Sequence, residues 1–122
     1  MDKFAFDFLD AVTSNRKDVA FRMLSNILGN GGEVFSVLGL LINQFELMLE
    51  TKEMAESTRD TQKMAEILKM NPFRVKKALS YGDKFEKKKL QSILSQLYEI
   101  DRNIKTGMME QNLALELLIG RI

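Results

Sequence analysis

The sequence predicts an all-α protein, and three observations lead to that fold class. Leu, Met, Glu, Lys and Gln are frequent whereas Pro occurs once, and this composition favours helices. Apolar residues recur at helical spacing along most of the chain, and no segment alternates with the period of two that marks a strand. Short breaks rich in Gly, Asn and Asp separate the periodic segments. We therefore expect one bundle of about six or seven helices, formed as a single domain by residues 1–122.

Two short helices are expected before the first glycine-rich break. The first begins near Asp2, a suitable N-cap, and the second follows the pair Ser14-Asn15. Phe6 faces away from the apolar stripe of the first helix. That stripe consists of Phe4, Phe8, Leu9 and Val12. The break at residues 29–32 ends the second helix, because Gly and Asn tolerate positive φ.

The third helix is expected to be the longest and to occupy the centre of the bundle. It opens at Glu33 and runs to about Ser57. Its apolar residues wrap most of the circumference, and a helix that is apolar all round is buried on most sides. Leu41 lies in the middle of this apolar run, so we expect it in the core.

Residues 61–82 predict two helices joined by a tight turn, in the pattern of a helix-turn-helix. Asn71 can cap the second helix and Pro72 suits its first position, where the missing N–H costs nothing. Lys69 stands at the turn position where such pairs usually have Gly. The residues expected to face inward are Ala65, Leu68, Met70, Val75 and Leu79.

Two further helices complete the expected bundle. One starts near Asp83 and ends at Gly107, and the last begins near Glu110. Asp101 and Glu116 neighbour the apolar stripes of these helices, where an acid must be paired because an unpaired buried charge is costly. We interpret both acids as structural, with Asp101 tying its helix to a neighbour, rather than as a general acid/base pair. The two stripes consist of Leu90, Ile93, Leu94, Leu97 and Ile104, and of Leu113, Leu117 and Leu118.

The composition excludes most catalytic chemistry. The absence of Cys removes disulfides, thiol nucleophiles and thiolate metal sites, and the absence of His removes the usual general base. The glycines at residues 29–32 lack the Lys and Ser/Thr of a phosphate-binding loop. We expect no catalytic residue, cofactor or metal, so a small enzyme is the least favoured interpretation. With no secretory signal and no apolar span of bilayer length, we expect a cytoplasmic protein without a membrane partner.

Charge is segregated along the chain, although the net charge is only +1. Residues 63–89 carry nine basic and three acidic side chains, a net of +6, whereas residues 1–62 carry six and ten, a net of −4. There are three interpretations of such a basic segment: it binds nucleic acid, it is a helix face exposed to solvent, or it contacts an acidic neighbour in an assembly. Together with the helix-turn-helix pattern, it leaves a DNA-binding regulator as an alternative function.

Five segments resemble, in order, the C-terminal region of the delta-subunit family of bacterial DNA polymerase III clamp loaders. Residues 70–79 read Met-Asn-Pro-Phe-Arg-Val-Lys-Lys-Ala-Leu, similar to that family's His/Asn-Pro-Phe/Tyr turn and Val-Lys-Lys-Ala helix. Residues 101–107 resemble its Asp-x-x-x-Lys-Thr/Ser-Gly helix end, and residues 113–118 its closing helix. Residues 6–12 and 37–45 fit the family's pattern as well. Two residues depart from the family's pattern: Asn71 stands where His is common, and Gly39 lies inside the long helix. Neither departure puts the fold in doubt.

The resemblance implies a non-catalytic C-terminal collar domain that supports sliding-clamp loading in DNA replication. Two AAA+-like domains would precede it in the whole subunit, where they open the sliding clamp without hydrolysing ATP. Members of this family pack their collar domain beside those of the other clamp-loader subunits, of the gamma/tau and delta-prime types, so contact with DNA is expected to be weak or indirect. The residues that we expect to be structural are Asn71, Pro72, Asp101, Gly107 and Glu116. The candidate interface residues are Phe6, Arg74, Lys77, Tyr98 and Lys105.

Overall fold

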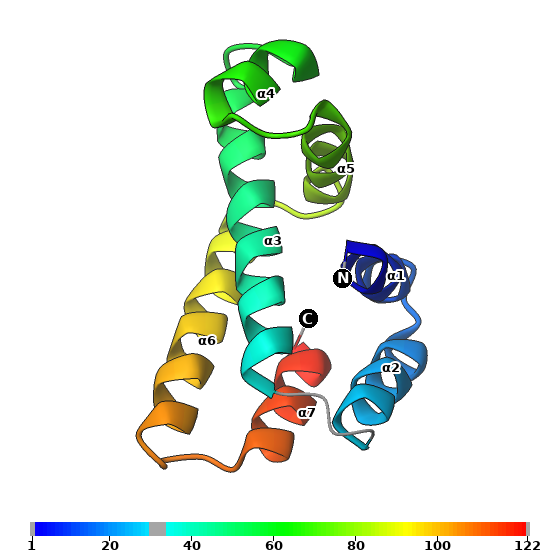
Figure 1. Cartoon of the computed structure of the whole chain (residues 1–122), viewed down its shortest axis with the longest axis vertical. Helices are drawn as coiled ribbons and strands as arrows, with labels where there is room; N and C mark the ends of the chain where they lie inside the picture. The colour runs from blue at the N-terminus through cyan, green and yellow to red at the C-terminus, as the bar shows by residue number, and fades with distance from the viewer. Residues whose placement is uncertain (1, 30–33, 122) are drawn as a thin grey trace.

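The computed structural model describes residues 2–29 and 34–121, which form seven α-helices and no strand (Figure 1). This confirms the predicted all-α fold class and the expected six or seven helices. The helices are α1 (Asp2–Thr13), α2 (Lys17–Gly29), α3 (Val34–Met54), α4 (Thr61–Leu68), α5 (Pro72–Gly82), α6 (Lys87–Lys105) and α7 (Gln111–Arg121).

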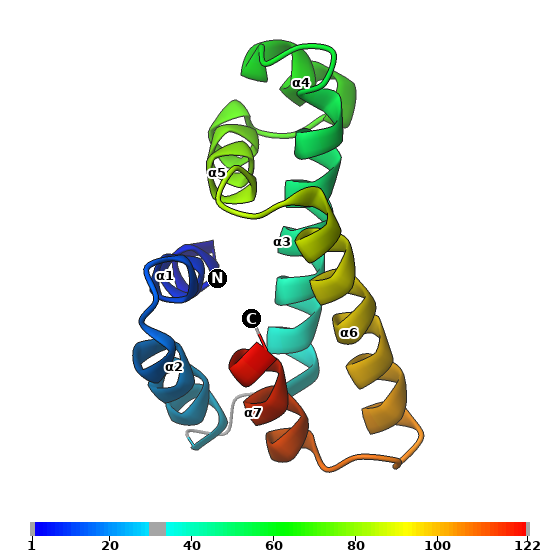
Figure 2. The ribbon, with the colours of Figure 1, turned by 180° about the vertical axis from the view of Figure 1, so that it is seen from behind.

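Helix α3 is the axis of the bundle, as its apolar circumference predicted. Figures 1 and 2 show α6 along one side of it, α4 and α5 against its C-terminal half, and α1, α2 and α7 gathered on the side of its N-terminal half. Its apolar residues therefore meet neighbours in several directions, and Leu41 is fully buried. The buried apolar residues of α3 are Val37, Leu38, Leu41, Phe45, Leu47 and Met48.

Helix α6 packs against α3 through the stripe expected from its sequence. All five residues of this stripe are buried: Leu90, Ile93, Leu94, Leu97 and Ile104. The helix begins at Lys87, however, and not near Asp83 as expected. The reason is that the N–H of Asp83 still donates to the carbonyl of Leu79 at the end of α5, while its carboxylate pairs with Arg59 at 2.7 Å. Asp83 thus closes α5 rather than opening α6.

Other expectations need smaller corrections. Helix α3 ends at Met54 instead of Ser57, because the N–H of Ser57 donates to the carbonyl three residues back and so tightens the last turn. The expected start at Glu33 lies outside the described residues. Three residues expected to face inward are exposed instead, namely Met70 (36%), Leu113 (49%) and Leu117 (42%). Helix α7 contacts the core through Ala114 and Leu118. Of the three leucines of its expected stripe, only Leu118 is therefore buried.

At the ends of three described helices, one residue adopts the left-handed backbone conformation, and a backbone hydrogen bond closes the turn around it. These residues are Asn15 (φ 60°), Lys69 (φ 55°) and Gly107 (φ 75°). The N–H that follows each of them donates to the carbonyl five residues back, at 2.8 to 3.0 Å, as in a Schellman motif. Gly and Asn adopt this conformation readily, whereas Lys69 adopts it at a steric cost of about 1 kcal/mol.

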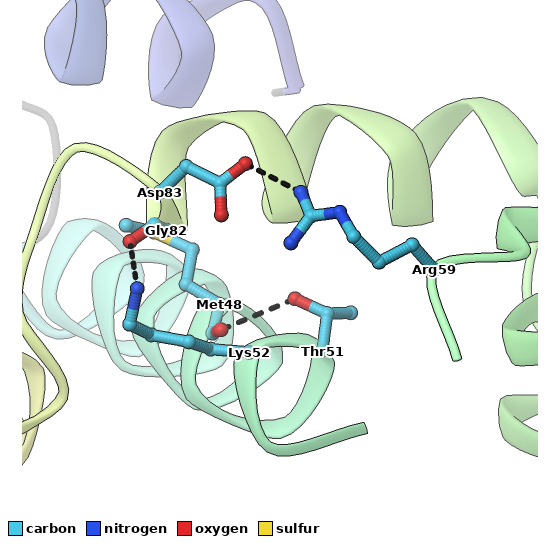
Figure 3. Close-up of polar contacts among 6 residues, drawn as sticks. All are labelled: Met48, Thr51, Lys52, Arg59, Gly82 and Asp83. Atoms are coloured by element: carbon cyan, nitrogen blue, oxygen red, sulfur yellow. Dashed lines mark hydrogen bonds and ion pairs between the residues drawn. The ribbon is translucent and has the colours of Figure 1, made fainter. Parts of the chain in front are cut away.

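Helix α5 makes its closest approach to α3 at Gly82. A Cβ atom at this position would lie 3.2 Å from the carbonyl oxygen of Met48. Around the same point, Lys52 Nζ donates to the Gly82 carbonyl at 3.2 Å, and Asp83 meets Arg59 (Figure 3). These contacts hold the C-terminal end of α5 on α3, and they thereby fix the position of the α4–α5 pair.

A pair of glycine substitutions tests this approach. Gly82→Ala should lower the free energy of unfolding by about 1 kcal/mol or more, because the added methyl group would push against the helical backbone of Met48 at 3.2 Å. Gly39→Ala is the matched control within a helix. Beyond the neighbouring turns of its own helix backbone, nothing lies within 4 Å of the Cβ that it adds, so it should stabilise the protein by about 0.5–1 kcal/mol. Urea unfolding followed by circular dichroism measures both changes. A Gly82→Ala protein as stable as Gly39→Ala would contradict a tight α3–α5 contact.

Candidate subunit-interface site

The five candidate interface residues fall into two groups on opposite sides of α3. Phe6 lies on α1, and Arg74 and Lys77 lie on the neighbouring helix α5. Tyr98 and Lys105 lie on α6, across the axis of the bundle (Figures 1 and 2). The structure therefore brings Phe6 together with Lys77 and separates both from Tyr98 and Lys105.

Phe6 is packed between α1 and α5. Its ring stacks on Tyr81, with centroids 6.1 Å apart and an interplanar angle of 24°. It also meets Phe73 edge to face, at 6.3 Å and 78°. The Nζ of Lys77 lies 5.9 Å from the centroid of Phe6 and 5.7 Å from that of Phe73, which are cation–π distances. Phe6, which faces away from the apolar stripe of α1, thus contacts α5 instead.

Tyr81 ties α5 to α1 through its hydroxyl group. This group donates to Asp10 Oδ1 at 2.7 Å and lies 3.2 Å from the carbonyl oxygen of Phe6. Burial, followed by the hydrogen bond to Asp10 and the charges of Asp10 and Asp7, raises the pKa of Tyr81 well above its usual range. The hydroxyl group therefore remains a hydrogen-bond donor throughout the neutral and mildly alkaline range.

The α6 candidates have partners of a different kind. Tyr98 is 45% exposed, and its hydroxyl donates to Glu46 Oε2 of α3 at 2.5 Å. That hydrogen bond is the main cause that raises the pKa of Tyr98 to about 12, with burial and the charge of Glu46 adding to it. Lys105 pairs with Asp101 at 2.8 Å within α6. Both candidates are thus engaged in contacts within the domain and remain largely open to solvent.

The expectation that Asp101 ties α6 to a neighbouring helix is wrong. Its carboxylate pairs with Lys105, four residues further along the same helix, since an i,i+4 partner is within easy reach. Glu116 is exposed on α7, so it is not the acid on an apolar stripe that its neighbours suggested. Acids that do join two helices are Glu46, which is bonded to Tyr98, and Asp10, which is bonded to Tyr81. No local pattern marks the latter pair, because its members are 71 residues apart.

The remaining structural candidates lie at helix ends. Asn71 Oδ1 accepts the N–H of Phe73 at 2.8 Å, and Pro72 occupies the first turn of α5. Asp60 accepts two N–H groups in the first turn of α4, at 3.0 and 3.2 Å. Gly107 follows α6 with positive φ. Side chains thus satisfy the free N–H groups at both helix starts of the α4–α5 pair.

Comparison with known proteins agrees with this fold. A model of the family "DNA polymerase III delta subunit, C-terminal domain" matches residues 2–122. The chain belongs to this family. DNA polymerase III subunit delta of Bacillus subtilis (strain 168) is 29% identical over 119 residues, which cover 98% of this chain and 34% of the relative. The solved structure of the Bacillus subtilis DNA clamp loader delta protein (YqeN) matches with a TM-score of 0.90 and 30% identity, over 95% of this chain. This chain spans about a third, 34%, of the length of that protein.

In this delta C-terminal domain, α5 does not present the side chains of a DNA-reading helix. Its exposed residues are Phe73, Lys76 and Ser80, whereas Arg74 and Lys77 are half-buried. Helices that read the major groove present several Arg, Asn or Gln side chains to base edges. The exposed face of α5 offers one cation and one hydroxyl group, which is a poor match to that requirement.

Within residues 2–29 and 34–121, no group of three or more His, Cys, Asp or Glu side chains is placed to hold a metal ion. None of the helices that the structure describes is long and apolar enough to span a membrane.

The hydrogen bond between Asp10 and Tyr81 should stabilise the protein more than the pair of Asp101 with Lys105, and two substitutions measure the difference. Tyr81→Phe should lower the free energy of unfolding by about 1 kcal/mol, since it removes a hydrogen bond to a charged group between α1 and α5. Asp101→Asn should lower it by at most about 0.5 kcal/mol, because its ion pair is local and partly exposed. Thermal and urea unfolding at neutral pH measure both values. A larger loss for Asp101→Asn than for Tyr81→Phe would contradict these assignments.

Proposed function

We propose that this chain is the C-terminal collar domain of a DNA polymerase III delta subunit and that it holds the subunit in the clamp-loader complex. The observation that carries the proposal is the family match over residues 2–122, supported by a TM-score of 0.90 to the Bacillus subtilis clamp loader delta protein. In this proposal residues 1–122 form one domain, and AAA+-like domains precede it in the whole subunit. Its relatives extend well beyond the matched region, which covers 34% of each.

We also propose that the domain contributes assembly rather than catalysis. The chain has no Cys and no His, so the most common nucleophile and general base are missing. The expected partners are clamp-loader subunits of the gamma/tau and delta-prime types in the cytoplasm. Contact with DNA would be weak or arise through the assembly. The exposed face of α5 gives no support to the alternative of a DNA-binding regulator.

A reconstitution experiment tests the proposal. The purified domain is mixed with the other clamp-loader subunits, and the mixture is separated by size-exclusion chromatography. We expect the domain to elute with the assembly and to compete with full-length delta for it. Leu41→Asp supplies an unfolded control, because a charge at this fully buried position costs several kcal/mol. If the folded domain elutes alone under conditions where full-length delta assembles, the proposed function is wrong.

A further inference from the structure

The turn between α4 and α5 exposes three large apolar side chains within seven residues. Ile67, in the last turn of α4, is 61% exposed, Met70 in the turn is 36% exposed, and Phe73 in the first turn of α5 is 58% exposed. The buried core of the pair is made by other residues: Met64, Ala65, Val75 and Leu79. Folding of the pair therefore does not require Ile67 or Phe73 to be apolar. A cluster of exposed apolar side chains on an otherwise polar surface is typical of a protein–protein contact.

This exposed cluster, which we call the turn patch (Ile67, Met70 and Phe73), lies in the basic part of the molecule. Residues 61–82 carry five basic and one acidic side chain, a net of +4. Lys76 is exposed three residues after Phe73, on the same side of α5. Lys77 lies over the ring of Phe73 at 5.7 Å. The turn patch is thus an apolar surface bordered by cations.

The opposite end of the domain exposes an apolar surface of opposite charge. Figure 1 shows the α4–α5 turn near one end of α3 and the α6–α7 connection near the other. At this second end Met108, Leu113 and Leu117 are 78%, 49% and 42% exposed. Glu99 and Glu116 are exposed nearby, and Glu99 and Leu117 line a groove between α6 and α7. Arg102 and Lys105 are exposed at this end as well, so the excess of acid is small: residues 99–117 carry four acidic and two basic side chains, a net of −2.

We propose that the turn patch docks an acidic, apolar helix end of an adjoining clamp-loader subunit, of the kind that this domain itself presents at α6–α7. The proposal rests on the proposed function, in which collar domains of adjoining subunits pack side by side and each meets its neighbours through two different surfaces. Opposite charge on the two surfaces would set their orientation and speed their encounter. A basic, apolar turn at one end and an acidic, apolar helix pair at the other satisfy both requirements.

Single-stranded nucleic acid is a less suitable occupant of the turn patch. Its recognition relies on aromatic side chains on which successive bases stack. Ile67 and Met70 offer no aromatic surface, and Phe73 already contacts Phe6 and Lys77. Apolar side chains bordered by cations suit an apolar protein surface with carboxylates at its rim.

The test uses full-length delta assembled with the other loader subunits, with affinity measured by fluorescence anisotropy of labelled delta. Ile67→Glu should weaken assembly by about tenfold or more, since it places a charge in the contact. Lys76→Glu should weaken it by about fivefold and flatten its salt dependence. Arg22→Glu on α2, which makes the same charge change at an exposed site, should alter affinity by less than about twofold. A melting temperature within a few degrees of the wild type identifies the folded variants. Lys76 is exposed, so Lys76→Glu remains informative even if Ile67→Glu fails to fold.

The outcomes separate this inference from the proposed function. Weaker assembly of both Ile67→Glu and Lys76→Glu, but not of Arg22→Glu, would support the docking site. Assembly of both variants with wild-type affinity would overturn it and leave the proposed function intact. Failure of wild-type delta to assemble would instead overturn the proposed function. If the variants assemble normally but lose affinity for a labelled single-stranded oligonucleotide, the turn patch is a nucleic-acid surface and the docking proposal is wrong.

Discussion

Helix α5 lies so close to α3 that a side chain at position 82 would be tightly packed, and the placement of the α4–α5 pair depends on this contact. The carbonyl oxygen of Met48 would meet a Cβ atom there at 3.2 Å. Lys52 reaches from α3 to the Gly82 carbonyl, and Arg59, in the connection from α3 to α4, pairs with Asp83 (Figure 3). The C-terminal end of the pair is therefore attached to the central helix and to the connection that leaves it, and the pair is part of the bundle rather than a separate module.

This attachment determines which surfaces remain for partners. The inner side of α5 is buried against α3 and α4, and Phe6 of α1 covers a further part near Lys77. What remains open is the start of α5 and the turn before it, where Met70 and Phe73 are exposed beside Lys69 and Asn71, and the side chain of Asn71 already caps α5. A helix-turn-helix outline thus arises here from the packing of two short helices on a long one. The open surface of α5 accordingly gives no support to recognition of DNA sequence.

The sequence predicted what short-range interactions determine. The start of α5 at Asn71-Pro72 and the end of α6 before Gly107 depend on capping groups and φ preferences within a few residues. The start of α6 was misplaced because Asp83 suits an N-cap in isolation, yet in the fold it pairs with Arg59, 24 residues earlier. Asp101 was misread because position on a helical stripe does not distinguish a buried acid from one at its edge. Contacts between distant segments, such as Tyr81 with Asp10, leave no local pattern from which they could be inferred. The same holds for the interface candidates, which the resemblance suggested without indicating which face each occupies.

The most direct test of the central claim, that the α4–α5 pair is a packing unit and not a DNA reader, is titration of the domain against a library of random duplexes. At physiological salt the exposed face of α5 should give at most weak binding, which fades as salt rises and selects no sequence. Selection of one motif with sub-micromolar affinity at that salt would contradict the claim and restore the DNA-binding regulator.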